Sequence, residues 1–377
     1  MKQSNLLVPL MGVLLLIYFA VEGGQVTHAN VVTKTVAPAA TEWHDAQELG
    51  VRGLGWPELE KTYTRLPAKA KGQVTDEVWK LGQHSAGAHV QFTSTSKSIK
   101  VRWSVRGNNT LNHMAATGVK GVDLYARGPK GWQWVGAGKP TGKKNEAEIV
   151  ANMAAGQREF LLYLPLYDGV DSVAIGIESG ASISGVAKPA RKPIVIYGTS
   201  ITQGACASRA GMAYPAIIGR QLNRETINLG FSGNGKMDQE MATLLTDLDP
   251  SLYVLDCLPN MKPEEVLPRT LEVVLLLRAS RPDTPILLLE NINYAHTWID
   301  LHVSDLVQKK NHNLRQAYAQ LKAQGVKQLY YRNNKGLVNT DGEGTVDGVH
   351  LTDLGFSQLA GALVKDIKTI DKKSRLP

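Results

Sequence analysis

The chain has 377 residues, of which 43% are hydrophobic and 20% are charged. This ordinary globular composition excludes disordered, collagenous and coiled-coil proteins, and the length predicts two domains. The net charge of +8 comes from scattered lysines and arginines, which argues against a nucleic-acid-binding protein. Two cysteines, Cys206 and Cys257, are too few for a disulfide scaffold or a cysteine-based zinc site, and no histidine motif for a metal is present.

The first segment has the pattern of an export signal. Lys2 precedes an uncharged, mostly apolar run over Leu6–Val21, and Thr27–Ala29 offers small residues to a signal peptidase. Residues 1–29 are therefore predicted to be a signal peptide. The stretch Gln3–Val21 is close to the roughly 20 residues that span a bilayer, so a retained membrane anchor is the alternative. We expect an exported protein, periplasmic or secreted, with a membrane tether left open.

Residues from about 60 to 180 have the alternation of short antiparallel strands, within a predicted first domain over residues 45–185. In Ser98–Val105 every second side chain is apolar, which places these side chains on one face of a strand. Further short apolar runs are bounded by glycine, proline or asparagine, and they are Val122–Ala126, Trp132–Val135, Glu159–Leu164 and Val173–Ile177. Several short strands with turn residues between them predict an antiparallel β-sandwich or jelly roll.

After Pro193 the pattern changes to repeated strand, loop and helix. Five apolar segments are predicted strands: Ile194–Tyr197, Thr226–Leu229, Leu252–Leu255, Ile286–Leu289 and Gln328–Tyr331. The predicted helices that follow them are Tyr214–Leu222, Gln239–Leu248, Glu264–Leu277, Leu306–Ala323 and Asp353–Ile367. These units predict a flavodoxin-like, doubly wound parallel sheet of five strands over residues 190–377, with ligands at the carboxyl ends of the strands. Gly180–Lys192 has the composition of a linker and is the predicted domain boundary.

A serine follows the first strand of this sheet. Ile194–Tyr197 leads into G-T-S-I-T-Q-G over Gly198–Gly204, where Ser200 would lie exposed at the start of a helix, beside amides that stabilise negative charge. The alternative is that Thr199, Ser200 and Thr202 only cap that helix. The segment is not the G-x-S-x-G nucleophile elbow, because Thr202 stands where the second glycine belongs.

A general base for that serine is offered by Asp347-Gly348-Val349-His350. An aspartate three residues before a histidine in a tight turn can supply both the base and the carboxylate that orients it. With 9 histidines and 34 acidic residues such a spacing is expected by chance, so the spacing alone indicates little. Its position is more informative, because it follows the fifth strand and precedes the last helix, and so overlooks the same end of the sheet.

Two further strand ends offer hydrogen-bond donors for the carbonyl oxygen that becomes negative in acyl transfer. Asn228–Gly235 follows the second strand and contains glycines that allow close backbone approach. Leu255–Met261 follows the third strand and presents the amide of Asn260. Either loop alone could be an ordinary turn. The combination of four such features at four strand ends predicts an active site.

These residues together resemble the SGNH hydrolase superfamily, also called GDSL esterases, whose four blocks occur in the order Ser, Gly, Asn and Asp-x-x-His. The resemblance implies that Ser200 is the nucleophile, His350 the general base and Asp347 its orienting carboxylate. It also implies an oxyanion hole formed by the Ser200 and Gly233 amides and the Asn260 side chain.

The chain departs from the family pattern in two blocks. The usual G-D-S reads Gly198-Thr199-Ser200, and the usual G-x-N-D reads Leu258-Pro259-Asn260-Met261. The aspartate that helps to fix the first loop and the glycine before the oxyanion asparagine are thus absent. These changes affect the geometry of the loops and the substrate more than the nucleophile.

The first half carries a resemblance of its own. Gly121–Tyr125 reads G-V-D-L-Y and is similar to the G-x-D-L-Y signature of an N-terminal module found in one subgroup of these esterases. His84–Gly87, Tyr163–Tyr167 and Asp256–Met261 are also typical of that subgroup. In the subgroup this module is a β-sandwich packed against the catalytic domain, which agrees with the alternation described above.

The resemblance implies an exported serine esterase that acts on small acyl esters, with O-acetyl groups of carbohydrates as the expected substrate. It would use an acyl-enzyme and no cofactor or metal, and its partner would be a small-molecule or carbohydrate ester rather than a nucleic acid. An acyltransferase with the same acyl-enzyme and an alcohol acceptor is the first alternative. A non-catalytic carbohydrate-binding protein is the second, although all five site positions are filled.

Three further expectations concern side chains outside the motifs. His113 and Trp298 are candidates for lining the substrate site, with a structural histidine and plain packing as the alternatives. Cys206 and Cys257 would approach each other if the first and third strands are neighbours, so they form either a disulfide or two buried thiols. Asp123 is expected to fix a turn in its own domain.

Overall fold

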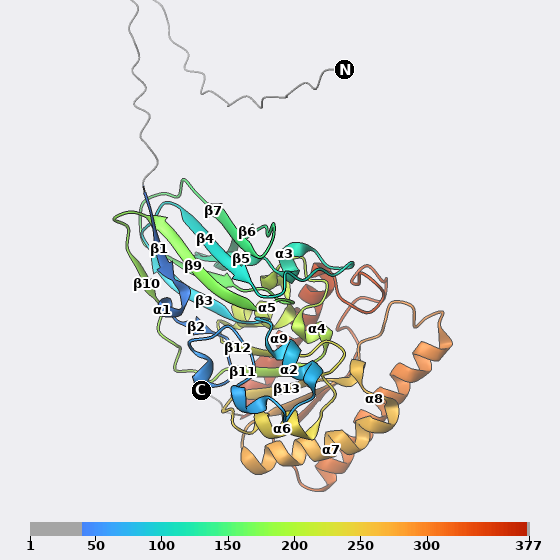
Figure 1. Cartoon of the computed structure of the whole chain (residues 1–377). Coiled ribbons are helices and arrows are strands. Elements are labelled where there is room, and N and C mark those ends of the chain that lie inside the picture. Colours follow the sequence, from blue (N-terminus) through green and yellow to red (C-terminus); the bar gives the residue numbers. More distant parts are fainter. Residues whose placement is uncertain (1–39, 375–377) are drawn as a thin grey trace, which may run out of the picture. The chain divides into compact units, whose positions relative to one another are not determined.

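The computed structural model describes residues 40–374, and the predicted signal segment 1–29 lies outside them. The described part contains two antiparallel sheets followed by a parallel sheet with helices on both faces (Figure 1). Among these residues, no helix is both long enough and apolar enough to span a membrane.

The first antiparallel sheet consists of β1 (Thr41–Asp45), β4 (Ile99–Val105), β7 (Lys144–Val150) and β9 (Val170–Glu178), in the order β1-β9-β4-β7. The second consists of β2 (Val51–Arg52), β3 (His89–Ser94), β5 (Val122–Gly128), β6 (Gly131–Gly138), β8 (Arg158–Tyr163) and β10 (Ile183–Gly185). Its order is β10-β3-β8-β5-β6, with β2 also paired to β3.

One apolar cluster draws side chains from both of these sheets. In β4, Val101 and Trp103 are buried as the period-two pattern predicted, and they share this cluster with Phe92 of β3 and Leu162 of β8. The antiparallel sandwich is therefore confirmed. The predicted linker Gly180–Lys192 is not wholly irregular, because its residues 183–185 form the edge strand β10 against β3.

The parallel sheet consists of β11 (Ile194–Gly198), β12 (Thr226–Gly230), β13 (Leu252–Asp256), β14 (Ile286–Leu289) and β15 (Leu329–Arg332). Its order is β12-β11-β13-β14-β15, and every neighbouring pair is parallel. This is the flavodoxin-like order. Each strand begins and ends within one residue of its predicted position, because continuous apolar runs mark strands that are buried on both faces.

The helices of this part are α4 (Ser200–Gln203), α5 (Tyr214–Leu222), α6 (Gln239–Leu245), α7 (Pro263–Ser280), α8 (Leu301–Ala323) and α9 (Asp353–Ser374). Helix α8 begins five residues before the predicted start, since the Asp300 carboxylate accepts a hydrogen bond from the Val303 N–H and caps it there. Helix α6 ends three residues early, in a tight turn over 246–248.

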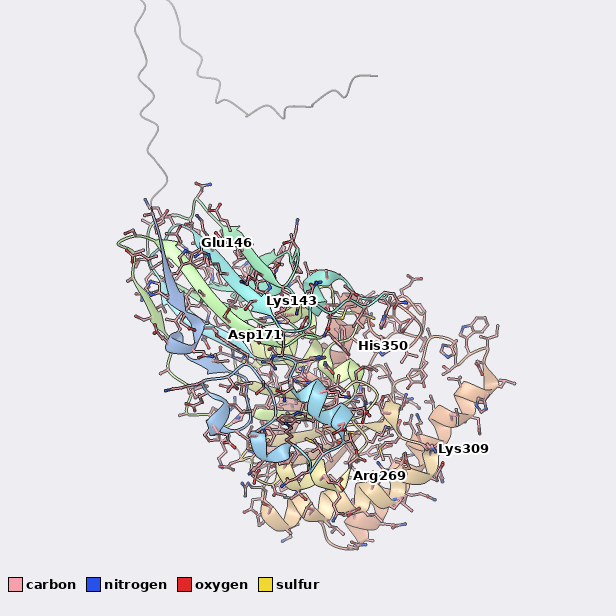
Figure 2. The ribbon with its side chains drawn as sticks, viewed as in Figure 1. Lys143, Glu146, Asp171, Arg269, Lys309 and His350 are labelled. Atoms are coloured by element: carbon pink, nitrogen blue, oxygen red, sulfur yellow. The ribbon has the colours of Figure 1, made fainter. Side chains whose placement is uncertain are left out.

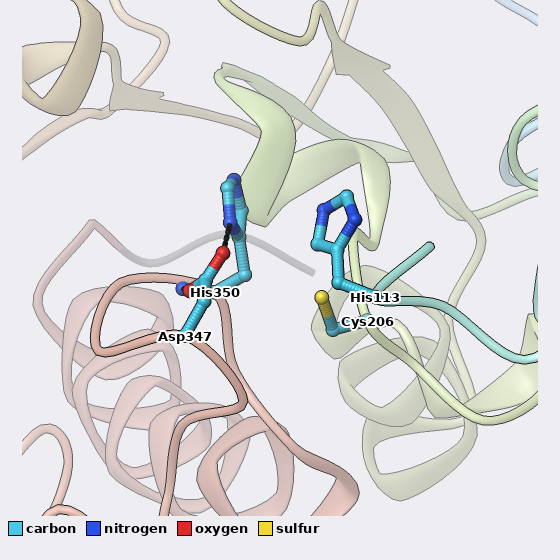
Figure 3. A group of neighbouring side chains, drawn as sticks. All are labelled: His113, Cys206, Asp347 and His350. Carbon is cyan, nitrogen blue, oxygen red and sulfur yellow. Dashed lines mark hydrogen bonds and ion pairs between the residues drawn. The ribbon is translucent and has the colours of Figure 1, made fainter. Parts of the chain in front are cut away.

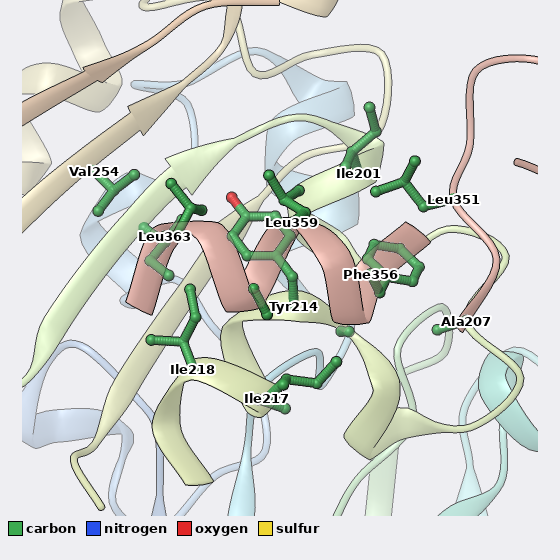
Figure 4. Close-up of a cluster of buried hydrophobic side chains, with 14 of the residues drawn as sticks. Ile201, Ala207, Tyr214, Ile217, Ile218, Val254, Leu351, Phe356, Leu359 and Leu363 are labelled. Carbon is green, nitrogen blue, oxygen red and sulfur yellow. The ribbon is translucent and has the colours of Figure 1, made fainter. Parts of the chain in front are cut away.

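Alternate residues of β11 point to two apolar clusters on opposite faces of the sheet. Ile194 and Ile196 pack with α5 and α9, and the close-up in Figure 4 shows this cluster. Val195 and Tyr197 pack with α6, α7 and α8. The sheet is therefore covered on both faces, and polar groups that serve a ligand are left to its edges and strand ends.

Short helices connect these elements. They are α1 (Ala46–Leu49), α2 (Asp76–Gly82) and α3 (Ala116–Val119), and the 3₁₀ turns η1 (Pro57–Leu59), η2 (Ala68–Ala70), η3 (Ala210–Met212) and η4 (Leu258–Asn260). Buried polar contacts join the segment between β2 and β3 to the parallel sheet. The Arg65 guanidinium, only 1% exposed, donates to the carbonyl oxygens of Asn228 at 3.2 Å and Gly230 at 2.6 Å.

Candidate active site

The turn after β11 presents Ser200. Thr199 caps α4, since its hydroxyl accepts a hydrogen bond from the Ile201 N–H at 3.3 Å. The helix is a single turn that ends at Gly204, whose φ of +109° suits glycine. Thr199 is therefore the residue that caps α4. The Ser200 hydroxyl, in a residue that is only 6% exposed, has a different hydrogen-bond partner.

The partner of that hydroxyl is His350. The distance from Ser200 Oγ to His350 Nε2 is 2.9 Å. The distance from His350 Nδ1 to Asp347 Oδ2 is 2.7 Å, and Figure 3 draws this second contact. Partial burial acts to raise the pKa of Asp347, but hydrogen bonds from the His350 ring and from the backbone N–H groups of His350 and Val349 lower it to about 2. Asp347 is thus a carboxylate at any ordinary pH, able to hold the histidine and stabilise its charged form.

The loop that carries His350 reaches Ser200 from the far edge of the sheet. It spans residues 333–352, between β15 and α9, and in the strand order β13 and β14 lie between β15 and the strand β11 that leads to Ser200. Gly348 has a φ of +88°, and a Cβ there would lie 2.8 Å from His296 Nδ1, so the turn requires glycine. The Ala295 N–H, in the segment between β14 and α8, donates a hydrogen bond to the Gly348 carbonyl oxygen at 2.8 Å and helps to fix the loop.

His350 lies between two groups of surface charges in the view of Figure 2. Labelled side chains of the antiparallel sheets and their connections lie on one side, and side chains of α7 and α8 lie on the other; they are Lys143, Glu146, Asp171, Arg269 and Lys309.

The turn after β11 that carries Ser200, Gly198–Gly204, is called the nucleophile turn after its candidate nucleophile. The loops after β12 and β13 lie on either side of it, because both strands pair with β11. Gly235 packs on that turn so closely that a Cβ would lie 1.8 Å from the Gly198 carbonyl oxygen. The Asn260 side chain faces the N–H groups of Gly233, Asn234 and Gly235, so its amide is assigned with the oxygen toward them, where it accepts hydrogen bonds at 3.2, 3.1 and 3.2 Å. The structure therefore brings Gly233 and Asn260 together, with the Gly233 N–H bonded to Asn260.

A buried carboxyl that sequence reasoning missed supports the nucleophile turn. Asp256, the last residue of β13, accepts hydrogen bonds from the Thr202 hydroxyl at 3.0 Å and the Tyr214 hydroxyl at 2.9 Å. Burial raises the pKa of Asp256 to about 7. An acidic anchor beneath this turn is thus present although the family aspartate is replaced by Thr199. The sequence marks Asp256 as an acid that ends an apolar strand and as the start of the stretch Asp256–Met261 typical of the subgroup, but neither signal gives its role.

Asp123 makes a contact within its own part of the chain and also reaches the other part. Its buried carboxylate accepts hydrogen bonds from Trp134 Nε1 at 2.7 Å, Arg209 Nη1 at 2.8 Å and the Gly211 N–H at 2.9 Å. Arg209 and Gly211 belong to the loop that follows α4. The prediction that Asp123 fixes a turn in its own domain was therefore incomplete, because this aspartate of the G-x-D-L-Y signature also holds a loop next to the candidate nucleophile.

The two candidate lining residues lie in different places. The His113 ring centroid is 5.5 Å from that of His350, so this histidine is next to the candidate base. Trp298 is 77% exposed and lines a hollow of about 210 Å³ together with Tyr294 and Thr345. The structure brings His113 to the serine–histidine pair and places Trp298 beside the loop that carries His350.

The two cysteines are free thiols. Both are buried, and they are not joined although β13 neighbours β11 as the disulfide alternative required. Cys257 Sγ is 3.6 Å from the Tyr197 carbonyl oxygen, whereas Cys206 lies with His113 and Asp347. Of the two alternatives, the structure has the buried thiols.

Comparison with protein families gives two matches that together cover most of the chain. Residues 191–368 match the GDSL-like lipase/acylhydrolase family, and residues 41–183 match the GxDLY family, the N-terminus of SGNH-hydrolase-type esterases. No curated protein matches the chain.

Three solved structures are similar to the chain. A GDSL-like lipase from Bacteroides ovatus is 38% identical over 88% of this chain and 98% of its own, with a TM-score of 0.85. The salicylyl-acyltransferase SsfX3 from a tetracycline biosynthetic pathway is 17% identical (82% and 90% covered, TM-score 0.68). The acetyl xylan esterase Est2A from Butyrivibrio proteoclasticus is 12% identical (88% and 98% covered, TM-score 0.55). Together with the family matches, the first of these shows that the chain belongs to the GDSL-like lipase/acylhydrolase family and is a carboxylic ester hydrolase with a GxDLY-type N-terminal part.

Proposed function

We propose that this protein is an exported serine esterase that removes small acyl groups, acetyl above all, from the hydroxyl groups of carbohydrates. One observation carries the proposal. A continuous hydrogen-bonded chain joins Ser200 Oγ to His350 Nε2 at 2.9 Å and His350 Nδ1 to Asp347 Oδ2 at 2.7 Å. This is the arrangement in which a neutral histidine can accept the serine proton.

The reaction proceeds through an acyl-enzyme. His350 Nε2 takes the proton from Ser200 Oγ as that oxygen attacks the ester carbonyl, and it returns the proton to the alcohol that leaves. Asp347 accepts from Nδ1–H and stabilises the imidazolium that forms. Water then attacks the acyl-serine by the same route in reverse, releases the acid and restores the serine.

The oxyanion is held by three donors, the N–H groups of Ser200 and Gly233 and the amide NH₂ of Asn260. Because three loop N–H groups hold the Asn260 oxygen, its NH₂ group is oriented before the substrate arrives. The Gly233 N–H shares its hydrogen between Asn260 and the oxyanion, as a three-centre hydrogen bond does.

The substrate class rests on two further observations. Ser200 is only 6% exposed, which favours an acyl group as small as acetyl. The carbohydrate alcohol is proposed by analogy with the acetyl xylan esterase of the same fold. The similarity to a salicylyl-acyltransferase favours a second candidate function, transfer of the acyl group from the same acyl-serine to an alcohol acceptor.

Export is the part of the proposal that rests on residues 1–29, with their basic start, apolar run and small-residue cleavage site. The destination is the periplasm or the outside of the cell, with a membrane tether if the apolar run is retained. Cell fractionation and N-terminal sequencing of the mature protein test it. A mature N-terminus near residue 30 is expected, and a cytoplasmic full-length chain would contradict export.

The first experiment is hydrolysis of p-nitrophenyl esters from acetate to octanoate, with Ser200→Ala beside the wild type. We expect activity to be highest on acetate, to fall with chain length and to be absent in the variant. Activity that survives in Ser200→Ala contradicts the acyl-enzyme. Adding alcohol acceptors then separates the two functions, because a transferase forms new ester in water while a hydrolase forms mainly acid.

A further inference from the structure

Four side chains with metal-binding atoms meet beside the candidate nucleophile. His113, Cys206, Asp347 and His350 each offer one such atom, and these atoms all lie within 4.8 Å of one another (Figure 3). They come from three separate segments, before α3, after α4 and before α9. The proposed hydrolysis uses Asp347 and His350 but gives no role to the Cys206 thiol.

The thiol is held in place by its backbone and by its neighbours. Cys206 has a φ of +70°, a left-handed conformation that a residue with a Cβ adopts only where the surroundings impose it. The loop on its far side is tied to α9, since the Asp353 carboxylate accepts a hydrogen bond from the Ser208 N–H at 3.0 Å. It is also tied to the antiparallel sheets through Arg209 and Asp123. The contacts to α9 and to the antiparallel sheets therefore fix the segment that carries the thiol.

We propose that His113, Cys206, Asp347 and His350 form a binding site for a thiophilic divalent cation of the Zn²⁺ type, whose binding switches the esterase off. Two imidazoles, a thiolate and a carboxylate are the ligand types that zinc prefers, in four-coordinate tetrahedral sites. Such a site has ligand atoms roughly 3.4 Å apart, so small side-chain rotations close the observed cluster. The thiolate and the carboxylate together balance the two positive charges.

Metal binding must displace a proton from the thiol. Burial and, secondarily, the charge of Asp347 raise the pKa of Cys206 to about 12, so without a metal the group is a neutral thiol that does not compete with catalysis. The balanced step is Zn²⁺ plus Cys–SH giving the zinc thiolate plus one H⁺. Since one proton is released, the affinity rises about tenfold for each pH unit above neutrality.

The switch follows from the fact that both ring nitrogens of His350 are in use. Nε2 faces the Ser200 hydroxyl and Nδ1 faces Asp347. A metal on Nε2 removes the proton acceptor, and a metal on Nδ1 displaces the carboxylate that orients the ring. The loss of activity therefore rests on the proposed function, whereas the binding of the metal does not.

Metal binding is tested on Ser200→Ala, which keeps all four ligands and makes the result independent of catalysis. Titration with CoCl₂ is expected to give one equivalent of bound cobalt with the near-ultraviolet absorption of a cobalt thiolate, which ZnCl₂ then abolishes. Adding Cys206→Ser should remove the thiolate band, and adding His113→Gln should weaken binding at least tenfold. His312→Gln, an exposed histidine on α8, is the matched control and should change nothing.

Inhibition is tested by p-nitrophenyl acetate hydrolysis in buffers of fixed free Zn²⁺, with each protein expressed relative to its own metal-free rate. The wild type should lose activity and recover it with EDTA, and Cys206→Ser should need at least tenfold more Zn²⁺. Circular dichroism checks that the variants fold. Cobalt bound without a thiolate band, or equal zinc sensitivity in Cys206→Ser, overturns the site.

A third result separates the two proposals. If Ser200→Ala binds cobalt through Cys206 while the wild type stays active with zinc bound, the switch is wrong, and both the metal site and the proposed esterase stand. If the wild type shows no esterase activity at all, the proposed function fails, and the cobalt spectra still decide the metal site.

Discussion

The nucleophile turn and the loop that carries His350 meet at one hydrogen bond, but they are built in opposite ways. The nucleophile turn is buried and short, and Thr199, Asp256 and the packed Gly235 hold it. The histidine loop spans residues 333–352, is partly exposed, and Asp347 is 38% exposed within it. Changes beneath the nucleophile turn should therefore alter stability, whereas changes in the histidine loop should alter catalysis and leave the core intact.

The largest expected effect tests the nucleophile alone. Ser200→Ala should reduce turnover by roughly 10⁴–10⁶-fold, because the attacking oxygen is lost. The melting temperature should hardly change, since the turn is capped by Thr199. Steady-state kinetics on p-nitrophenyl acetate and differential scanning calorimetry measure both. A variant that keeps a tenth of the wild-type turnover would show that another group is the nucleophile.

Loss of Asn260, the proposed oxyanion donor, should have the next largest effect. Asn260→Ala removes one oriented donor and should lower turnover about 10²–10³-fold with little change in KM, because the donor acts on charge that develops in the transition state. Asn234→Ala, in the neighbouring loop, is the matched control and should cost less than tenfold. Equal losses in the two variants would make Asn260 a structural residue of that loop.

A change in the histidine loop should act on catalysis and spare stability. Gly348→Ala forces a Cβ to within 2.8 Å of His296 Nδ1 at a φ of +88°. The resulting shift of His350 should lower turnover about 10–100-fold. The control is Gly361→Ala in α9, where a Cβ meets no atom within 4 Å, and which should keep full activity. A large fall in melting temperature for Gly348→Ala would contradict the contrast between the two regions.

The smallest expected effect is a change of the folding stability with pH that arises from Asp256, beneath the nucleophile turn. The pKa of Asp256 is about 7 in the fold but about 3.9 in an unfolded chain, so the folded state holds an extra proton between these values. Its contribution to the stability therefore falls as the pH rises from 4 to 7 and is constant above that range.

Asp256→Asn should remove this dependence. The melting temperature of the wild type minus that of the variant should thus decrease by a few °C between pH 4 and pH 8, as measured by calorimetry. A difference that stays constant with pH would mean that Asp256 is charged throughout. The opposite trend holds for Asp347, whose lowered pKa stabilises the fold above about pH 4 and loses that effect as the pH falls toward 2.

Much of the fold could be read from local patterns. The strands β11 to β15 lie within one residue of their predicted positions, because an apolar run that is buried on both faces is a local signal. Helix α8 and strand β10 were predicted less well. The start of α8 depends on a cap at Asp300, and β10 is three residues long and forms only because β3 lies beside it.

The candidate site divides in the same way. The sequence by itself determined the order of the motif blocks, the flavodoxin-like sheet and the strand ends at which Ser200, Gly233, Asn260 and His350 lie. Only the tertiary structure decided that Asp256 supports the nucleophile turn, that Asp123 holds the loop after α4, and that His113 and Cys206 meet His350. These contacts join residues far apart in the chain, and they depend on strand register and loop paths that no local spacing encodes.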